Sequence, residues 1–183
     1  MLSSPVWRGS PALAFRAGLL IGGALSAVVL VVVGSLLRVP LPWTARWALV
    51  AAALVLVLLR DIGVLRFTLP ENRRLVPESV FRLGRLLGPL QFGVEMGTGA
   101  RTYLPSGLPY VAGVAVLLAA PLSGALWVGV GFGVGRALMT TANLRYPGDW
   151  DAQWARYSGR LAAMLGAAFV VSLLGAVWLT APS

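Results

Sequence analysis

The sequence predicts an all-α fold: a polytopic membrane helical bundle of about five spans, in one integral membrane domain covering residues 1–183. Hydrophobic residues make up 58% of the chain and charged residues 11%, and the mean hydropathy is +0.82. Several uncharged apolar runs approach the roughly 20 residues that a membrane-crossing helix needs. The chain is too short for such a bundle and a separate soluble domain.

The first two spans are predicted from apolar runs that a short proline-bearing loop separates. Residues 17–37 carry no charge and exceed the roughly 7–15-residue apolar core of a secretory signal, so we expect a retained helix. Small residues within 22–27 allow another helix to approach closely. The run 43–65 predicts the second span, with Arg46 near its start and Arg60–Asp61 near its end.

An arginine-rich segment over 66–85 follows the second span. Val80, Leu83 and Leu87 recur at helical spacing, with Arg82 and Arg85 off that stripe, which predicts an amphipathic helix at the membrane interface. A solvated cytoplasmic loop is a sufficient explanation for this segment. The functional alternative is a binding patch for anionic lipid or an acidic partner.

The third span, residues 87–120, is predicted to be discontinuous. As one straight helix its 34 residues would measure roughly 51 Å, against a hydrocarbon core of about 30 Å. Pro105 and Pro109 remove backbone donors there, and irregular backbone at membrane depth survives only where protein buries it or it lines a polar cavity. The break is therefore the predicted ligand-binding site, with candidate residues Glu95, Thr98, Arg101, Thr102, Tyr103 and Ser106.

Glu95 and Arg101 are the two charges of this stretch that a loop does not explain. Intramembrane ionisable residues are costly and usually face a cavity or each other. Six residues apart in a continuous helix they would lie on opposite faces, so pairing them requires a break or another helix. Glu95 can become neutral, which makes it the candidate proton-coupled group. The alternative is that both charges lie among the inner headgroups.

Residues 122–141 and 161–181 predict the fourth and fifth spans, with an aromatic and arginine-rich loop between them. The fourth span contains the run GVGFGVG, whose two overlapping GxxxG pairs predict close helix packing. The run has no βαβ context, so it does not indicate a dinucleotide site. The predicted helix-packing residues are Gly129, Gly131, Gly133 and Gly135.

The distribution of arginine predicts the orientation. Twelve arginines fall near the N-terminus, over 60–85 and around the loop before the fifth span, whereas only Arg38 and Arg46 occupy the opposite side and Arg101 lies within the break. The positive-inside rule then places the N-terminus in the cytoplasm and the C-terminus outside, in a bacterial-type inner membrane. Because the same rule accounts for the net charge of +9, we expect no nucleic-acid partner.

The absence of cysteine and histidine excludes much chemistry. Without cysteine the chain has no disulfide, thiolate nucleophile or cysteine-ligated cluster, and without histidine it has no Ser-His-Asp triad or histidine haem ligand. Of the six acidic residues, only Glu95 lies inside an apolar stretch. We therefore expect no enzyme activity, no metal and no cofactor.

The order of motifs over roughly residues 48–181 carries a family resemblance. A Gly-rich entry and a proline-broken helix stand in FGVEMGTGARTYLPSGLPY, and an FGxG-like span follows in FGVGRAL. The pattern resembles the second repeat of the cytochrome c biogenesis transmembrane proteins, the CcdA/DsbD-type electron carriers. The resemblance implies a scaffold of inverted repeats with broken helices. It does not imply thiol–disulfide electron transfer, because the membrane cysteines of that family are missing here, and that family has six spans.

Two functions remain open from the sequence. One is a transporter-like or channel-like protein with a polar site at the broken helix. The other is a non-catalytic accessory subunit that packs on a larger membrane complex through its glycine-rich faces. The lipid bilayer is the expected partner in both cases, with a further membrane protein or a second copy of this chain as alternatives, and no substrate is indicated.

Overall fold

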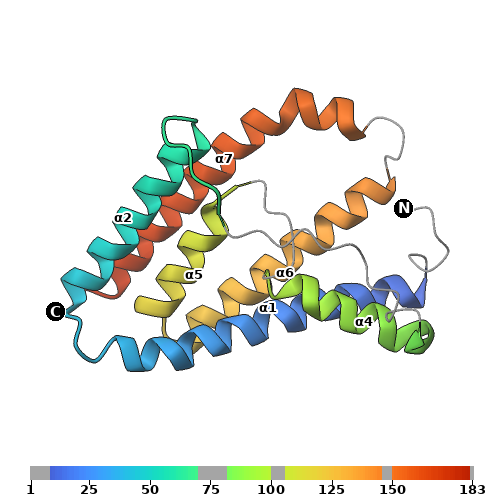
Figure 1. Cartoon of the computed structure of the whole chain (residues 1–183), viewed down its shortest axis with the longest axis horizontal. Helices are drawn as coiled ribbons and strands as arrows, with labels where there is room; N and C mark the ends of the chain where they lie inside the picture. The colour runs from blue at the N-terminus through green and yellow to red at the C-terminus, as the bar shows by residue number, and fades with distance from the viewer. Residues whose placement is uncertain (1–8, 70–81, 100–105, 146–149, 182–183) are drawn as a thin grey trace.

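A computed structural model of the chain describes residues 9–69, 82–99, 106–145 and 150–181, and the statements below concern those residues. The described part is all helical (Figure 1). Its helices are α1 (Ser10–Leu37), α2 (Trp43–Asp61), α4 (Gly84–Gly97), α5 (Leu108–Leu118), α6 (Leu122–Arg145) and α7 (Trp150–Leu179).

Three helices are long and apolar enough to cross a membrane, which supports the predicted membrane association. They are α1, α2 and the Leu122–Ala142 part of α6. Two further apolar helices, α5 and the Ala163–Leu179 part of α7, are shorter than a full span. α4 has 14 residues and measures about 21 Å, so it is also too short to cross a bilayer alone.

The helix boundaries differ from the predicted spans in three places. α1 begins at Ser10, with Pro11 in the first turn, where a missing N–H costs no helical hydrogen bond. α2 ends at Asp61 rather than at residue 65, because Gly63 takes a positive φ of 84° and ends the helix. α7 begins at Trp150, so much of the predicted loop before the fifth span forms one helix with that span.

Pro109 has a different role from the predicted one. It lies in the first turn of α5 and therefore starts this helix instead of breaking it. Pro105, the other predicted helix breaker, lies outside the described residues.

α1 is the axis on which α4, α5 and α6 pack. Gly18 of α1 lies against Leu90 of α4, and Gly34, further along α1, lies against Leu117 of α5. α4 and α5 therefore follow α1 one after the other, and both run parallel to it. On another face of α1, Gly23 lies against Gly129 of α6 and Leu19 against Gly133, so α6 runs antiparallel to α1.

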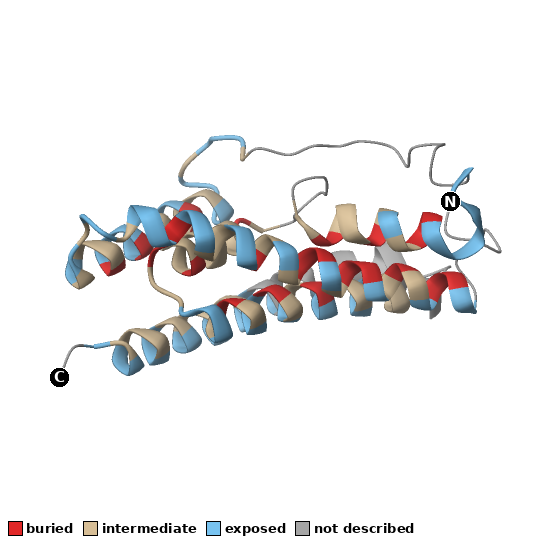
Figure 2. Cartoon of the chain, turned by 90° about the horizontal axis from the view of Figure 1, so that it is seen from below, coloured by how far each residue is buried: buried red, intermediate tan, exposed pale blue. Residues whose placement is uncertain are grey.

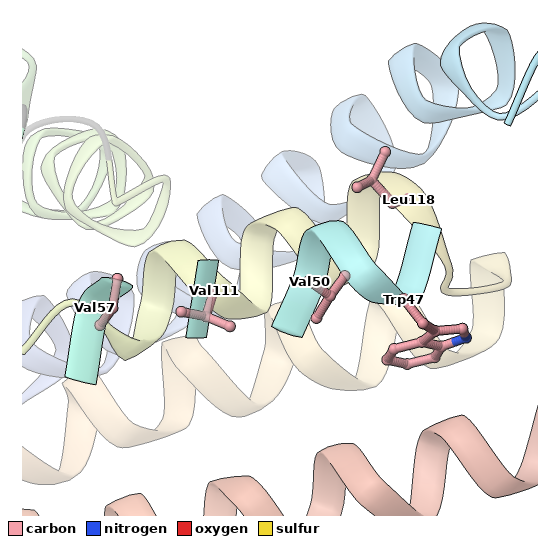
Figure 3. Packing of buried hydrophobic residues seen from close by; sticks show 5 residues of the cluster. All are labelled: Trp47, Val50, Val57, Val111 and Leu118. Atoms are coloured by element: carbon pink, nitrogen blue, oxygen red, sulfur yellow. The ribbon is translucent and has the colours of Figure 1, made fainter. Parts of the chain in front are cut away.

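α2, α5 and α7 form the second group of helices. Side chains of α2 and α5 alternate in one hydrophobic cluster, in the spatial order Val57, Val111, Val50, Leu118 and Trp47, so α2 is antiparallel to α5 (Figure 3). α7 packs on this cluster through its own apolar side chains. The indole N–H of Trp47 donates to Thr180 Oγ1 at 3.2 Å, which joins the start of α2 to the end of α7.

The resulting helix directions alternate along the chain, except that α4 and α5 share one direction. Taking α1 as forward, α2 is reversed, α4 and α5 are forward, α6 is reversed and α7 is forward. The two ends of the described chain accordingly lie at opposite ends of the molecule (Figure 1). Buried residues of neighbouring helices face one another, while the outward faces carry exposed apolar side chains (Figure 2).

Backbones approach closely at several positions where α1 meets α4. A Cβ added to Gly18, Gly22, Gly93 or Gly97 would lie within 3 Å of backbone atoms of the other helix. Each helix thus presents a GxxxG pair to the other, and the sequence analysis identified neither pair. Small residues allow the dispersion contacts that hold membrane helices together, and their Cα–H groups can face carbonyl oxygens.

The four predicted packing glycines of α6 lie on two different faces. Gly129 and Gly133 contact the backbone of α1, where a Cβ would clash with Gly23 and Leu19. Gly131 and Gly135 have open space beside them. The two overlapping GxxxG pairs therefore have different surroundings: one contacts α1, and the other lies on the opposite side of α6.

This difference predicts a split between glycine variants. Gly22→Leu and Gly133→Leu should lower the free energy of unfolding by at least the ~1–3 kcal/mol that overpacking costs, because backbone atoms cannot rotate out of the way. Gly131→Leu and Gly135→Leu are matched controls and should stay within about 0.5 kcal/mol of the parent. Thermal unfolding of the purified protein in detergent, followed by circular dichroism, measures both sets. Equal destabilisation of all four variants would contradict the packing described here.

Candidate functional site

The predicted site falls between the end of α4, which lies beside the middle of α1, and the start of α5, which lies beside the end of α2. The hydroxyl of Ser26 on α1 donates to the carbonyl oxygen of Thr98 at 3.1 Å, just beyond the end of α4. Gly99 follows with a φ of 75°, a conformation that ends helices. Three of the predicted residues, Arg101, Thr102 and Tyr103, lie outside the described residues.

Glu95 and Thr98 lie together in the last turn of α4. The Thr98 hydroxyl donates to the carbonyl oxygen of Glu95 at 2.7 Å, so it satisfies one of the carbonyls that a helix end leaves unpaired. The carboxylate of Glu95 is 3.5 Å from the side-chain amide nitrogen of Gln91, one turn earlier. The side chains of Glu95 and Thr98 are both half-buried. These two predicted residues therefore lie at the C-terminal end of α4 and stabilise it.

Ser106 lies at the other side of the break and binds a residue of α2. Oδ2 of Asp61 accepts hydrogen bonds from the Ser106 hydroxyl at 2.9 Å and from the Gly107 N–H at 3.0 Å. Ser106 Oγ in turn accepts from the Leu108 N–H at 3.2 Å. Oδ1 of Asp61 forms an ion pair with Arg60 at 2.9 Å. A carboxylate thus occupies the partially positive N-terminal end of α5, where it is electrostatically favoured.

Asp61 is the residue of this region that sequence reasoning missed. We expected it to be an interfacial residue at the end of the second span, and its partner is 45 positions away in the chain. The available signal was an acidic residue at the end of an apolar span, which by itself does not indicate a partner. Only the antiparallel pairing of α2 with α5 brings its carboxylate to Ser106.

A second charged residue holds the opposite end of α5. The Arg38 guanidinium donates to the carbonyl oxygens of Val116, Leu117 and Ala120, which lie at or just after the end of this helix. A cation is favoured there by the helix dipole. Burial, and then the neighbouring Arg46, lower the pKa of Arg38 from its ordinary value. Arginine remains charged at neutral pH even so.

The predicted residues therefore flank the break without forming a single cluster. At the end of α4, Glu95 contacts Gln91 and Thr98 contacts Ser26. At the start of α5, Ser106 contacts Asp61 instead. Within the part of the chain that the structure describes, no group of three or more His, Cys, Asp or Glu side chains could hold a metal ion. The site therefore consists of the end of α4 and the start of α5, whose backbone groups form hydrogen bonds with side chains of neighbouring helices.

Comparison with known proteins adds no assignment, since no family model, curated protein or solved structure matches this chain. The function is therefore argued from the geometry of the chain itself.

The contact between Asp61 and Ser106 predicts an energetic coupling. Asp61→Asn and Ser106→Ala should each destabilise the protein, and the double variant should lose less than the sum by about 0.5–3 kcal/mol, because Asp61→Asn already weakens the charge-assisted hydrogen bond and Ser106→Ala removes it. We expect the lower half of that range because Asp61 is exposed. Chemical denaturation in detergent gives the four free energies. Ser35→Ala, at an exposed position on α1, is the control that should add independently to Asp61→Asn.

Proposed function

We propose that this chain is a small bacterial-type inner-membrane protein that crosses the bilayer five times and is transporter-like or channel-like, with its polar site at the break between α4 and α5. The observation that carries the proposal is the course of these two helices along α1. They contact α1 in succession and in the same general direction, and α4 ends beside Ser26. Two half-length helices in series then make the third crossing that neither could make alone.

The alternating helix directions support five crossings. Forward and reversed elements succeed one another from α1 to α7 when α4 and α5 count as one crossing. An odd number of crossings puts the two termini on opposite sides, in agreement with their positions at opposite ends of the molecule (Figure 1). The arginine distribution then favours a cytoplasmic N-terminus.

The break has the features that membrane carriers use for polar ligands. Discontinuous helices present a partially negative carbonyl end and a partially positive amide end near the middle of the membrane. Here these ends adjoin Ser26, Thr98 and Ser106, with the carboxylates of Glu95 and Asp61 beside them. The proposed site residues are Asp61 and the six predicted from the sequence: Glu95, Thr98, Arg101, Thr102, Tyr103 and Ser106. The family resemblance described from the sequence remains a prediction about the scaffold alone.

The second candidate function is a non-catalytic subunit of a larger membrane complex. Its supporting observation is the open Gly131–Gly135 pair on α6, next to Trp127, whose exposed fraction is 78%. Such a face suits a helix of another protein. Purification separates the two functions: a subunit should co-purify with a partner in fixed ratio and be unstable alone, whereas a carrier should reconstitute by itself.

The proposed topology makes a direct prediction. Reporter fusions after Arg46 and at Ser183 should report the outside of the membrane, and fusions after Arg74 and Asp151 the inside. The alternation of helix directions requires this pattern once the N-terminus is cytoplasmic. A C-terminal reporter on the inside would mean that the α4–α5 pair does not cross the membrane.

The absence of cysteine makes the site itself testable. If water reaches the break, Ser26→Cys and Thr98→Cys should react with a small water-soluble thiol reagent in reconstituted protein. Val29→Cys and Val32→Cys are the matched controls on α1, with exposed fractions of 59% and 60%. They should react only after denaturation, because a thiol must ionise to react and hydrocarbon suppresses ionisation. If Ser26→Cys and Thr98→Cys are as inert as the controls, the break is closed to water and the subunit becomes the better account.

A further inference from the structure

The start of α4 carries a surface on which cations and large apolar side chains alternate. Arg82 and Arg85 are exposed. Between and beside them, Leu83, Leu86 and Leu87 are exposed by 45%, 51% and 64%. Among described residues, neither arginine forms an ion pair. We call these five residues the α4 entry surface.

The packing of the fold does not use this surface. α4 meets α1 further along the helix, at Leu90, Gly93 and Gly97, while Gly88 and Pro89 are the first buried residues of α4. The arginines are also poorly placed for the stability of α4 itself. Its first turn contains no acidic residue, and a cation near the N-terminal end of a helix opposes the helix dipole. Helix stability therefore does not explain why two arginines stand there.

We propose that the α4 entry surface binds anionic phospholipid. The guanidinium groups of Arg82 and Arg85 would contact the phosphate, a geometry that arginine forms well, and Leu83, Leu86 and Leu87 would lie along the first part of the acyl chains. Charge complementarity selects the headgroup, because basic residues beside a membrane segment attract anionic lipid. The exposed leucines select a lipid over a soluble anion, because a free phosphate leaves them in water. The inference is independent of whether the break carries a substrate.

Native mass spectrometry of the purified full-length chain tests this proposal, with phosphatidylglycerol and phosphatidylcholine of the same chain length as probes. The parent should retain phosphatidylglycerol in preference to phosphatidylcholine, and added salt should reduce the preference. Arg82→Gln combined with Arg85→Gln should weaken phosphatidylglycerol binding on the order of tenfold or more. Arg82→Lys with Arg85→Lys should keep most of the preference, because the charge is kept.

The matched control removes two other exposed arginines, Arg156 and Arg160 of α7, by the same change to glutamine. This control should bind phosphatidylglycerol as the parent does. An equal loss in both double variants would overturn the proposal, because net charge rather than a defined surface would then govern binding. So would a parent that does not distinguish the two lipids. An acidic protein that co-purifies with the parent and is lost from Arg82→Gln/Arg85→Gln, with lipid preference unchanged, would assign the surface to a protein partner instead.

Discussion

The close approach of α1 to its neighbours is the constraint on which the rest of the structure depends. In a bilayer, lipid is as apolar as the helix surface, so burying leucine against leucine gives little driving force, and close contact between backbones becomes the main attraction. α1 provides it on two faces at once, with Gly18 and Gly22 toward α4 and Gly23 toward α6. A side chain at any of these positions would separate α1 from the helix it contacts, and at Gly18 or Gly22 it would also move the end of α4 away from Ser26.

Once α4 and α5 pack on α1, the unpaired backbone groups at the two ends of the shorter helix, α5, still need hydrogen-bond partners. Unpaired backbone groups that water does not reach are costly, and α5 has only 11 residues over which to offset them. Both of its ends are satisfied by residues that border α2: Asp61 at the N-terminal end and Arg38 at the C-terminal end. The signs of the two charges match the helix dipole, so α2 with its flanking residues holds α5 both by hydrogen bonds and by electrostatics.

Whether the sequence predicts a feature depends on how far apart along the chain the interacting residues lie. Hydropathy predicted the long helices, because it is a local property. The length of residues 87–120 predicted more than one helix there, and α4 and α5 are separate helices. Asp61 could not be assigned to the start of α5 in the same way, since only the pairing of α2 with α5 brings them together. The glycines fall between these cases: their spacing indicates a packing face, but only the structure separates Gly133, against α1, from Gly131, in open space.

The arginines at the two ends of the molecule differ in what they bind as well as in number. Arg38 donates to three carbonyl oxygens of the α5 end, and Arg46 donates to the carbonyl oxygens of Leu41 and Arg38 itself. Their hydrogen-bonding capacity is therefore directed inward, to backbone carbonyl oxygens. At the other end, Arg82, Arg85, Arg156 and Arg160 are exposed. Simple counting treats all these cations alike, yet Arg38 and Arg46 bind backbone, so the exposed positive charge is more one-sided than the number of arginines indicates.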